Sequence, residues 1–572
     1  MEEKITGAEA LIRSLLAEGV DTVFGYPGGQ IITVYDKLYD YSHKINHILV
    51  RHEQGAIHAA EGYARISNKP GVVIVTSGPG VANVVTGLSD AQMDNTPIVV
   101  ISGQVGAKFL GCDAFQETDV VGITLPVTKW SLQVRSADDI PAAVAKAFYI
   151  ATTGRPGPVV LDIARDAQVG TLTWEYEPIK FIRSYDPRPA ISTSDLVKAA
   201  ALINSAKRPM ILAGHGVMIA EAENELVALA EKAGIPVATT LLGLSTIPSH
   251  HPLNKGMLGM HGNIGPNYQT NRADVILAIG MRFDDRITSD VSHYAPDAKI
   301  IHIDIDSSEF NRIVPIEACI HGDAKDALIH LLPLIEENNH EEWSAEFDKC
   351  NAQEKELVID KELHHDGRIT MGEVVDRVAE ATEGRAILVT DVGQNQMMSA
   401  RYFRFTEPRS IVTSGGLGTM GFGLPAAIGA KLADPERTVC FFSGDGGFQM
   451  TIQELGTIMQ YGIDVKMIIL NNSFLGNVRQ WQDLFYNHRY SQTPLCDPDF
   501  CMIAEAYGIA SEKVERREQI APAVERMLAH KGAYLLNVIV DETDNVFPMV
   551  PPGGKIDEIL ISRTQKFSPN VN

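Results

Sequence analysis

The chain has 572 residues, and at about 100 to 200 residues per domain this length predicts three or four domains rather than one small fold. It carries 49 Lys and Arg against 72 Asp and Glu, and the resulting net charge of −23 argues against sequence-independent binding of nucleic acid. The apolar runs are strand-sized and the acidic N-terminus lacks an apolar signal segment, so we expect a cytoplasmic protein with no membrane partner.

Apolar runs alternate with amphipathic segments and glycine-rich turns along the whole chain, which is typical of parallel α/β sheets. The first region covers residues 1–170 and begins with a predicted helix over residues 8–16. Its predicted buried strands lie at 71–76, 98–102 and 159–163. A connector containing several prolines follows, so we place a domain boundary there.

The second region covers residues 192–335, with predicted strands at 210–213, 275–279 and 300–305. Residues 336–368 are rich in charge and contain no glycine before Gly367. This composition favours a solvated helical linker over a packed layer.

The third region covers residues 368–572. Its predicted strands lie at 386–390, 439–443 and 465–470. Residues 71–80 and 438–446 share one pattern, a strand followed by a tight turn and a helix. The first and third regions are therefore expected to share a topology.

A Gly-Asp-Gly-Gly turn, residues 444–447, follows one predicted strand of the third region, and Asn471-Asn472 follows the next. Because the carboxyl ends of parallel strands lie at one edge of a sheet, Asp445 and Asn472 are expected to be neighbours. Their oxygens suit a hard cation such as Mg²⁺, and the glycines allow backbone N–H groups to approach phosphates. The alternative is a glycine turn followed by an asparagine cap.

This pairing resembles the magnesium and diphosphate motif of thiamine diphosphate enzymes. Over nearly its whole length the chain also resembles the large, catalytic subunit of the acetohydroxyacid synthase (acetolactate synthase) family. The matching segments are residues 25–29, 51–55, 61–65, 76–80, 113–117, 154–158, 256–262, 282–286, 415–421 and 478–482. The resemblance implies three α/β domains, each with a mainly parallel, doubly wound sheet: a pyrimidine-binding domain (1–170), a central FAD-binding domain (192–335) and a diphosphate- and Mg²⁺-binding domain (368–572).

Glu53 follows the apolar pair Leu49-Val50 at a predicted strand end. An isolated glutamate there would be read as a helix cap or a surface carboxylate. The resemblance implies instead that it bonds the pyrimidine N1′ of thiamine diphosphate and favours the tautomer that removes the cofactor's C2 proton.

The resemblance assigns most of the remaining site residues to cofactors. Metal ligation is implied for Asp445, for Asn472 and for the backbone carbonyl of Phe474. The residues implied to contact thiamine diphosphate are Gln394, Asn395, Gly418, Met420, Gly446 and Gly447. Those implied to contact FAD are Arg155, Gly214, Gly216, Thr240, Leu241, Gly259, Met260, His261, Arg282, Asp284, Asp304, Ile305 and Asp323.

The reacting carbon and the second substrate involve four further positions by the same resemblance. Phe115 and Gln116 match positions near the reacting carbon, while Trp481 and Arg286 match the pocket that selects the second ketoacid. Without the resemblance, Trp481 would be read as a core residue and the Arg-Phe-Asp-Asp-Arg run at 282–286 as a surface charge cluster. Asn395 departs from the family pattern, in which a histidine is usual.

The implied reaction joins two pyruvate molecules to 2-acetolactate and CO₂, or pyruvate and 2-oxobutanoate to 2-aceto-2-hydroxybutanoate. It is the first common step towards the branched-chain amino acids. The implied partners are a second copy of the chain, in a homodimer or a tetramer, and a regulatory small subunit. Other readings are a flavin-containing relative, such as pyruvate oxidase or a carboligase, and a nucleotide-binding protein without enzymatic activity.

Overall fold

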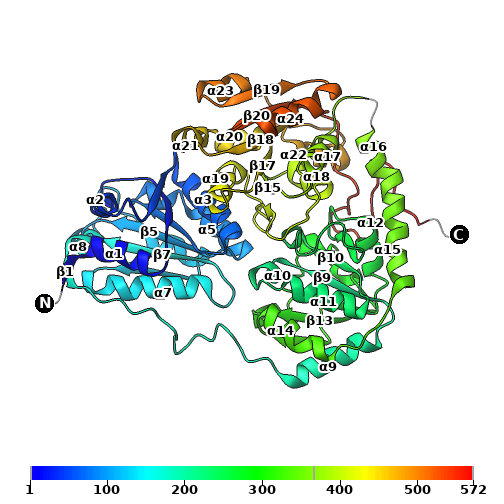
Figure 1. The fold of residues 1–572 in the computed structure, drawn as a ribbon, viewed down its shortest axis with the longest axis horizontal. Coiled ribbons are helices and arrows are strands. Elements are labelled where there is room, and N and C mark those ends of the chain that lie inside the picture. Colours follow the sequence, from blue (N-terminus) through cyan, green and yellow to red (C-terminus); the bar gives the residue numbers. More distant parts are fainter. Residues whose placement is uncertain (1–2, 365–366, 570–572) are drawn as a thin grey trace.

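The computed structural model describes residues 3–364 and 367–569 and contains three sheets of six strands, drawn in sequence colours in Figure 1. The first sheet has the order β3 (Asn46–Leu49), β2 (Thr22–Gly25), β4 (Gly71–Val75), β5 (Ile98–Gln104), β7 (Pro158–Ala164) and β6 (Trp130–Val134). Its strands pair in parallel throughout. A separate antiparallel pair joins β1 (Lys4–Thr6) to β8 (Thr171–Thr173).

The third sheet repeats the topology of the first. Its order is β16 (Ile411–Val412), β15 (Ile387–Thr390), β17 (Val439–Gly444), β18 (Val465–Asn471), β20 (Tyr534–Ile539) and β19 (Ala510–Val514), again with parallel pairing. In both sheets the order, counted along the chain, is second, first, third, fourth, sixth and fifth strand. The expected shared topology is therefore confirmed.

The central sheet has a different order: β11 (Asn254–Met257), β10 (Val237–Thr239), β9 (Pro209–Ala213), β12 (Val275–Ile279), β13 (Lys299–Asp304) and β14 (Ala318–His321). Counted along the chain this is 3-2-1-4-5-6, the order of dinucleotide-binding sheets, whose ligands lie where the order reverses. In this sheet the reversal lies between β9 and β12.

All nine predicted strands are present, because each is an apolar run that is buried on both faces, as parallel strands covered by helices must be. Several other strands were not predicted. β19, for example, has the sequence ASEKV and lies at a sheet edge, where one side remains accessible and the apolar pattern is weak. The α/β class with parallel sheets is confirmed.

The expectation of a solvated linker after the central region is wrong. Residues 341–363 are helical, but α15 (Glu341–Glu354) buries Trp343, Phe347 and Cys350 in the core of the central sheet. These residues are spaced at i, i+4 and i+7, so they form an apolar stripe that the surrounding charges hide in a composition count. The Trp343 indole also donates a hydrogen bond to the carbonyl of Pro209 (2.8 Å).

The first and third regions meet along two helices, α3 (Glu53–Ser67) and α19 (Gly423–Ala433), which lie side by side in Figure 1. Glycines permit the contact. A Cβ added to Gly62 would lie 2.0 Å from the carbonyl oxygen of Ala426, and one added to Gly429 would lie 1.8 Å from that of Ala59. The backbones of the two helices therefore touch. The first of these helices, α3, begins at Glu53.

We expect Gly429→Ala to lower the melting temperature by several degrees, because its methyl group meets backbone that cannot move without separating the helices. Overpacking of this kind costs about 1–3 kcal/mol. Thermal unfolding followed by circular dichroism measures the change. The matched control is Gly29→Ala, where an added Cβ has no atom within 4 Å. Equal melting temperatures for the two variants would contradict the close approach.

Candidate functional site

Asp445 lies at the carboxyl end of β17, where it begins α20 (Asp445–Met450). It is fully buried, and neither of its carboxylate oxygens has a hydrogen-bond partner among the described residues. Burial, together with the neighbouring charge of Asp497, raises the pKa of Asp445 to about 8. A buried carboxylate left without partners is a site that needs a cation or a proton.

Asn472 comes directly after the neighbouring strand β18, as the sequence predicts. Its amide donates to Gln394 Oε1 (3.2 Å), and its Oδ1 accepts from the backbone N–H of Phe474 (3.1 Å). Gln394 in turn donates to Gln480 Oε1 (3.0 Å). The strand-end loop is thus fixed by buried amides, with Gln394 and Asn472 in direct contact.

A buried carboxylate that was not predicted, Asp391, organises the glycine-rich loop of this edge. It accepts hydrogen bonds from the backbone N–H groups of Gly421 (3.0 Å) and Gly423 (3.1 Å). A Cβ on Gly447 would lie 2.4 Å from its Oδ1, so that glycine leaves room for the acid. The signal in the sequence was a Thr-Asp pair at the end of a predicted strand.

The loop held by Asp391 carries Gly418 and Met420 towards α20. Gly418 has a positive φ of 73°, a conformation that favours glycine. The methyl group of Met420 lies 3.9 Å from a Cβ placed on Gly446. The side-chain nitrogen of Asn395 lies 3.6 Å from a Cβ placed on Gly444, and its buried Oδ1 has no partner among the described residues. The residues expected around a diphosphate therefore gather at this sheet edge.

Glu53 begins α3 just beyond β3, at the carboxyl edge of the first sheet. Its Oε2 accepts a hydrogen bond from Asn83 Nδ2 (2.9 Å), and its Oε1 lies 3.5 Å from a Cβ placed on Gly80. The helix start at Glu53 thus faces the Thr-Ser-Gly-Pro-Gly turn at 76–80. Asn83, its partner, was not predicted.

Gln116 and Phe115 lie in a loop beside that turn. Gln116 has a positive φ of 59°, and its Cβ lies 3.0 Å from a Cβ placed on Gly78. Phe115 is 86% exposed in the single chain. The structure therefore brings Gln116 to the turn that faces Glu53, whereas the ring of Phe115 is exposed to solvent.

Glu454, from the third region, fixes the turn that precedes Glu53. Its carboxylate accepts from the backbone N–H groups of Arg51 (3.0 Å) and His52 (3.1 Å). Burial raises the pKa of this carboxyl. Sequence reasoning missed this contact because it joins residues about four hundred positions apart.

A cavity of about 520 Å³ lies at the carboxyl edge of the central sheet, where the strand order reverses. Its floor is backbone: a Cβ on Gly216 would lie 2.6 Å from the Cα of Gly280, so the loops after β9 and β12 touch. The residues expected to contact FAD line this cavity, with the exception of Gly214. Gly214 instead packs against the carbonyl of Gly280 beneath the floor.

Three arginines line the cavity: Arg155, Arg282 and Arg286. Arg155 comes from the first region and pairs with Asp306 (3.0 Å) and Glu309 (2.8 Å) of the central region. The Arg286 guanidinium lies 3.5 Å from the sulfur of Met260. Because guanidinium groups bind pyrophosphate and carboxylate oxygens in forks, the lining suits an anionic dinucleotide.

The same cavity reaches the third region through Gly393, Gly418, Asn477 and Trp481. Trp481 and Arg286, expected at the second substrate, therefore share one space with the expected flavin contacts. Glu53, Asp445 and Asn472 are not among the described residues that line it. In the single chain, Glu53 and the strand ends that carry Asp445 and Asn472 therefore lie outside this cavity.

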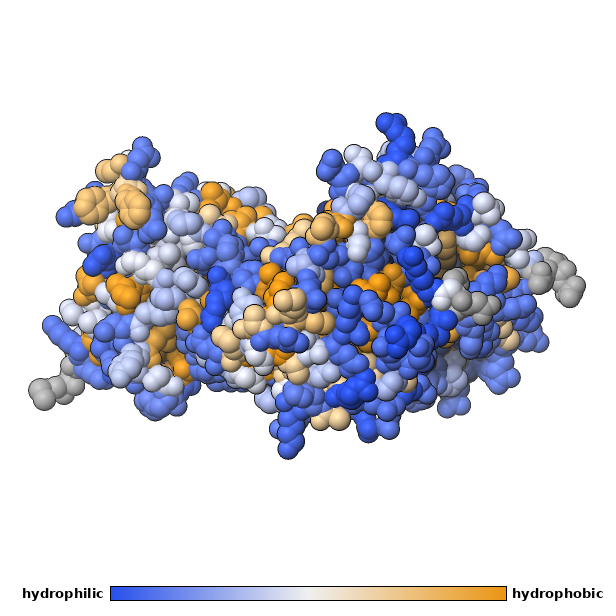
Figure 2. All heavy atoms as spheres, turned by 90° about the horizontal axis from the view of Figure 1, so that it is seen from above, coloured by the Kyte–Doolittle hydropathy of each residue, from blue (hydrophilic) through white to orange (hydrophobic). Residues whose placement is uncertain are grey.

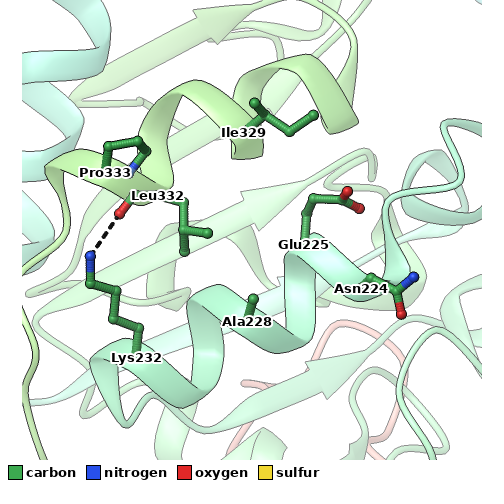
Figure 3. Close-up of a pocket in the computed structure, with 7 residues that line it drawn as sticks. All are labelled: Asn224, Glu225, Ala228, Lys232, Ile329, Leu332 and Pro333. Carbon is green, nitrogen blue, oxygen red and sulfur yellow. Dashed lines mark hydrogen bonds between the residues drawn. The ribbon is translucent and has the colours of Figure 1, made fainter.

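A second hollow, an open groove of about 570 Å³, lies between α11 (Glu223–Ala233) and α14 (Ala324–Leu331) (Figure 3). Ala228, Ile329, Leu332 and Pro333 form its apolar walls, and Lys232 donates to the Leu332 carbonyl at one side (3.1 Å). It lacks the converging polar groups typical of an active site.

The residues present fit the groups that the sequence suggests. The unpartnered oxygens of Asp445 suit a hard divalent cation. The cavity has a dinucleotide strand order, a glycine floor and an arginine lining, all of which suit FAD. Across the described residues, no helix combines the length and the apolar character that crossing a membrane requires.

Comparison with known proteins places three family models on the chain. They are the N-terminal TPP binding domain (residues 5–123), the central domain (196–331) and the C-terminal TPP binding domain (391–538) of thiamine pyrophosphate enzymes. The chain is 44% identical to the acetolactate synthase large subunit of Haemophilus influenzae, over 99% of each chain. It is 42% identical to the acetolactate synthase isozyme 2 large subunit of Escherichia coli, over 97% of this chain and 99% of that protein. Three domain matches in the expected order and full-length similarity lead to one conclusion: the chain belongs to the thiamine pyrophosphate enzyme family, among the acetolactate synthase large subunits.

Proposed function

We propose that this chain condenses two molecules of pyruvate to 2-acetolactate with release of CO₂, and pyruvate with 2-oxobutanoate to 2-aceto-2-hydroxybutanoate. The observation that carries the proposal is similarity at 44% identity over 99% of the chain to a protein named acetolactate synthase large subunit. Both products lead to branched-chain amino acids.

Thiamine diphosphate is the proposed cofactor, and when bound it supplies the carbon nucleophile and the electron sink that decarboxylation requires. The chain's part is positioning and charge placement. Asp445, Asn472 and the carbonyl of Phe474 would hold Mg²⁺ against the diphosphate, with Gly446 and Gly447 beside its oxygens. Unpartnered carboxylate oxygens at the end of β17 support this assignment.

Glu53 is the proposed acid at the pyrimidine end. Its carboxylate sits at a helix start and is oriented by the amide of Asn83. A carboxyl group in that position can hold or release a proton at N1′, which is the proton-transfer role we assign to it.

FAD is the proposed occupant of the cavity at the carboxyl edge of the central sheet. The twelve lining residues from the expected set support this, as does the strand order of the central sheet. Arg286 and Trp481, which both line this cavity, would bind the carboxylate and the apolar side of the second ketoacid.

A homodimer is the proposed minimum unit. Figure 2 shows apolar side chains gathered along a notch in one face of the single chain. Large apolar residues around the candidate site are exposed, among them Phe115 and Leu417 in loops and Met450 at the end of α20. Exposed apolar surface of this kind marks protein interfaces. A small regulatory subunit is a further proposed partner, because the similar proteins are named large subunits.

Incubating the purified chain with pyruvate, thiamine diphosphate, Mg²⁺ and FAD tests the activity. We expect acetolactate, detected as acetoin after acidification, and release of CO₂ without reduction of an electron-accepting dye. Dye reduction without acetolactate would indicate an oxidase and would reject the proposal.

We expect Arg282→Ala to lower FAD affinity by tenfold or more, since a charge-assisted hydrogen bond contributes about 1.5–3 kcal/mol. Flavin absorbance after gel filtration at limiting FAD measures the loss. The matched control is Arg208→Ala, an exposed arginine of the same region that does not line the cavity. Equal flavin content in both variants would exclude Arg282 from the flavin site.

A further inference from the structure

A strand-like pairing brings residues 493–497 back to the cation edge of the third sheet. Leu475 donates its backbone N–H to the carbonyl of Thr493 (2.9 Å), and Leu495 donates to the carbonyl of Ser473 (2.8 Å). The loop that follows Asn472 and the segment that ends at Asp497 are therefore locked side by side.

Asp497 reaches the same point as Asp445. Gln449, one turn along α20, donates its side-chain amide to Asp497 Oδ1 (3.1 Å) and to the backbone carbonyl of Asp445 (3.3 Å). One side-chain amide therefore contacts both residues. Gln449 thus orients the second acid towards the first.

Three carboxylate oxygens of these two residues have no hydrogen-bond donor among the described residues. Both oxygens of Asp445 and Oδ2 of Asp497 are buried and have no hydrogen-bond partner among the described residues. A divalent cation beside two such carboxylates would offset the repulsion between their charges. Carboxylate oxygens are the ligands that hard divalent cations prefer.

We propose that Asp497 is a second carboxylate of the divalent-cation site, beyond the Asp, Asn and carbonyl ligands of the proposed function on which this inference rests. The pair gives the site two negative charges supplied by protein alone. The chain therefore binds the cation before thiamine diphosphate arrives and presents the cofactor with a preloaded metal.

Mn²⁺ titrated into the full-length chain without thiamine diphosphate tests this, with free Mn²⁺ measured by electron paramagnetic resonance. We expect a single site in the wild-type chain and at least a tenfold weaker affinity in Asp497→Asn. The removed charge is one of two beside a doubly charged ion, so the effect is large at this range. Glu505→Gln, the loss of one charge from an exposed residue of the following helix, is the matched control and is expected to bind normally.

The two proposals fail differently. Weakened binding in both Asp497→Asn and Asp445→Asn supports the inference. Weakened binding in Asp445→Asn alone overturns the role of Asp497 and leaves the metal site intact. Unchanged binding in both variants rejects the metal assignment itself, and a wild-type chain that takes up Mn²⁺ only with thiamine diphosphate overturns preloading. Asp497→Ala, which keeps no oxygen at all, repeats the comparison if the asparagine variant folds poorly.

Discussion

Asp445→Ala is expected to abolish Mg²⁺-dependent retention of thiamine diphosphate. The wild-type side chain offers two buried oxygens that have no hydrogen-bond partner among the described residues, so its removal deletes both of them from the proposed cation site. We expect the affinity for thiamine diphosphate at saturating Mg²⁺ to fall at least a hundredfold, since removing one partner of a buried ionic contact costs about 3–5 kcal/mol. Isothermal titration calorimetry measures the change.

The pH dependence of the stability of the metal-free chain provides the control. The pKa of Asp445 is raised to about 8 from the ordinary value of 3.8, so the folded chain holds a proton that the unfolded chain releases. Its contribution to stability is therefore complete below about pH 4 and is lost as the pH rises through 8. Asp445→Ala lacks this dependence and should be no less stable than the wild type at pH 8. Normal thiamine diphosphate affinity in a folded variant would contradict the metal assignment.

Glu53→Gln is expected to lower turnover about 10²–10⁴-fold, the usual contribution of one acid–base group. Glutamine keeps the shape of the side chain and its contact with Asn83 but cannot exchange a proton at the pyrimidine nitrogen. Acetolactate formation at saturating pyruvate gives the turnover number.

Flavin content separates a catalytic from a structural effect. Glu53 does not line the cavity of the central sheet, so Glu53→Gln should retain FAD and melt at the wild-type temperature. Glu177→Gln, at an exposed position of the connector, controls for the loss of one charge. Unchanged turnover in Glu53→Gln would remove that residue from the mechanism.

The strands that could be predicted are those whose sequence alone reports their burial. β17 and β18 are apolar runs hidden on both faces, and their end positions place Asp445 beside Asn472. Edge strands such as β19 carry a weaker pattern and were not predicted. The packing of α15 was not predicted because its three buried apolar residues are a minority among charged residues.

Contacts between segments that are distant in the sequence are the part of the site that could not be predicted. Motif positions indicated which residues lie at strand ends, but not that Glu454 binds the turn before Glu53 or that Gln449 connects Asp497 to Asp445. Such contacts depend on how three sheets pack, and no local pattern encodes that. The arginine and glycine positions of the cavity were found only through their motif resemblance.

The hydrogen bonds of Glu454 have a mechanical consequence. Asp445 and Glu454 belong to one short uninterrupted stretch of chain, from α20 through the turn that ends at Glu454. One end carries the candidate cation ligand and the other holds the backbone from which Glu53 projects. In a dimer, each reaction centre would take its acid from one subunit and its metal from the other. This stretch would then connect the two centres directly, so that a movement of the metal ligand at one centre would shift the acid at the other.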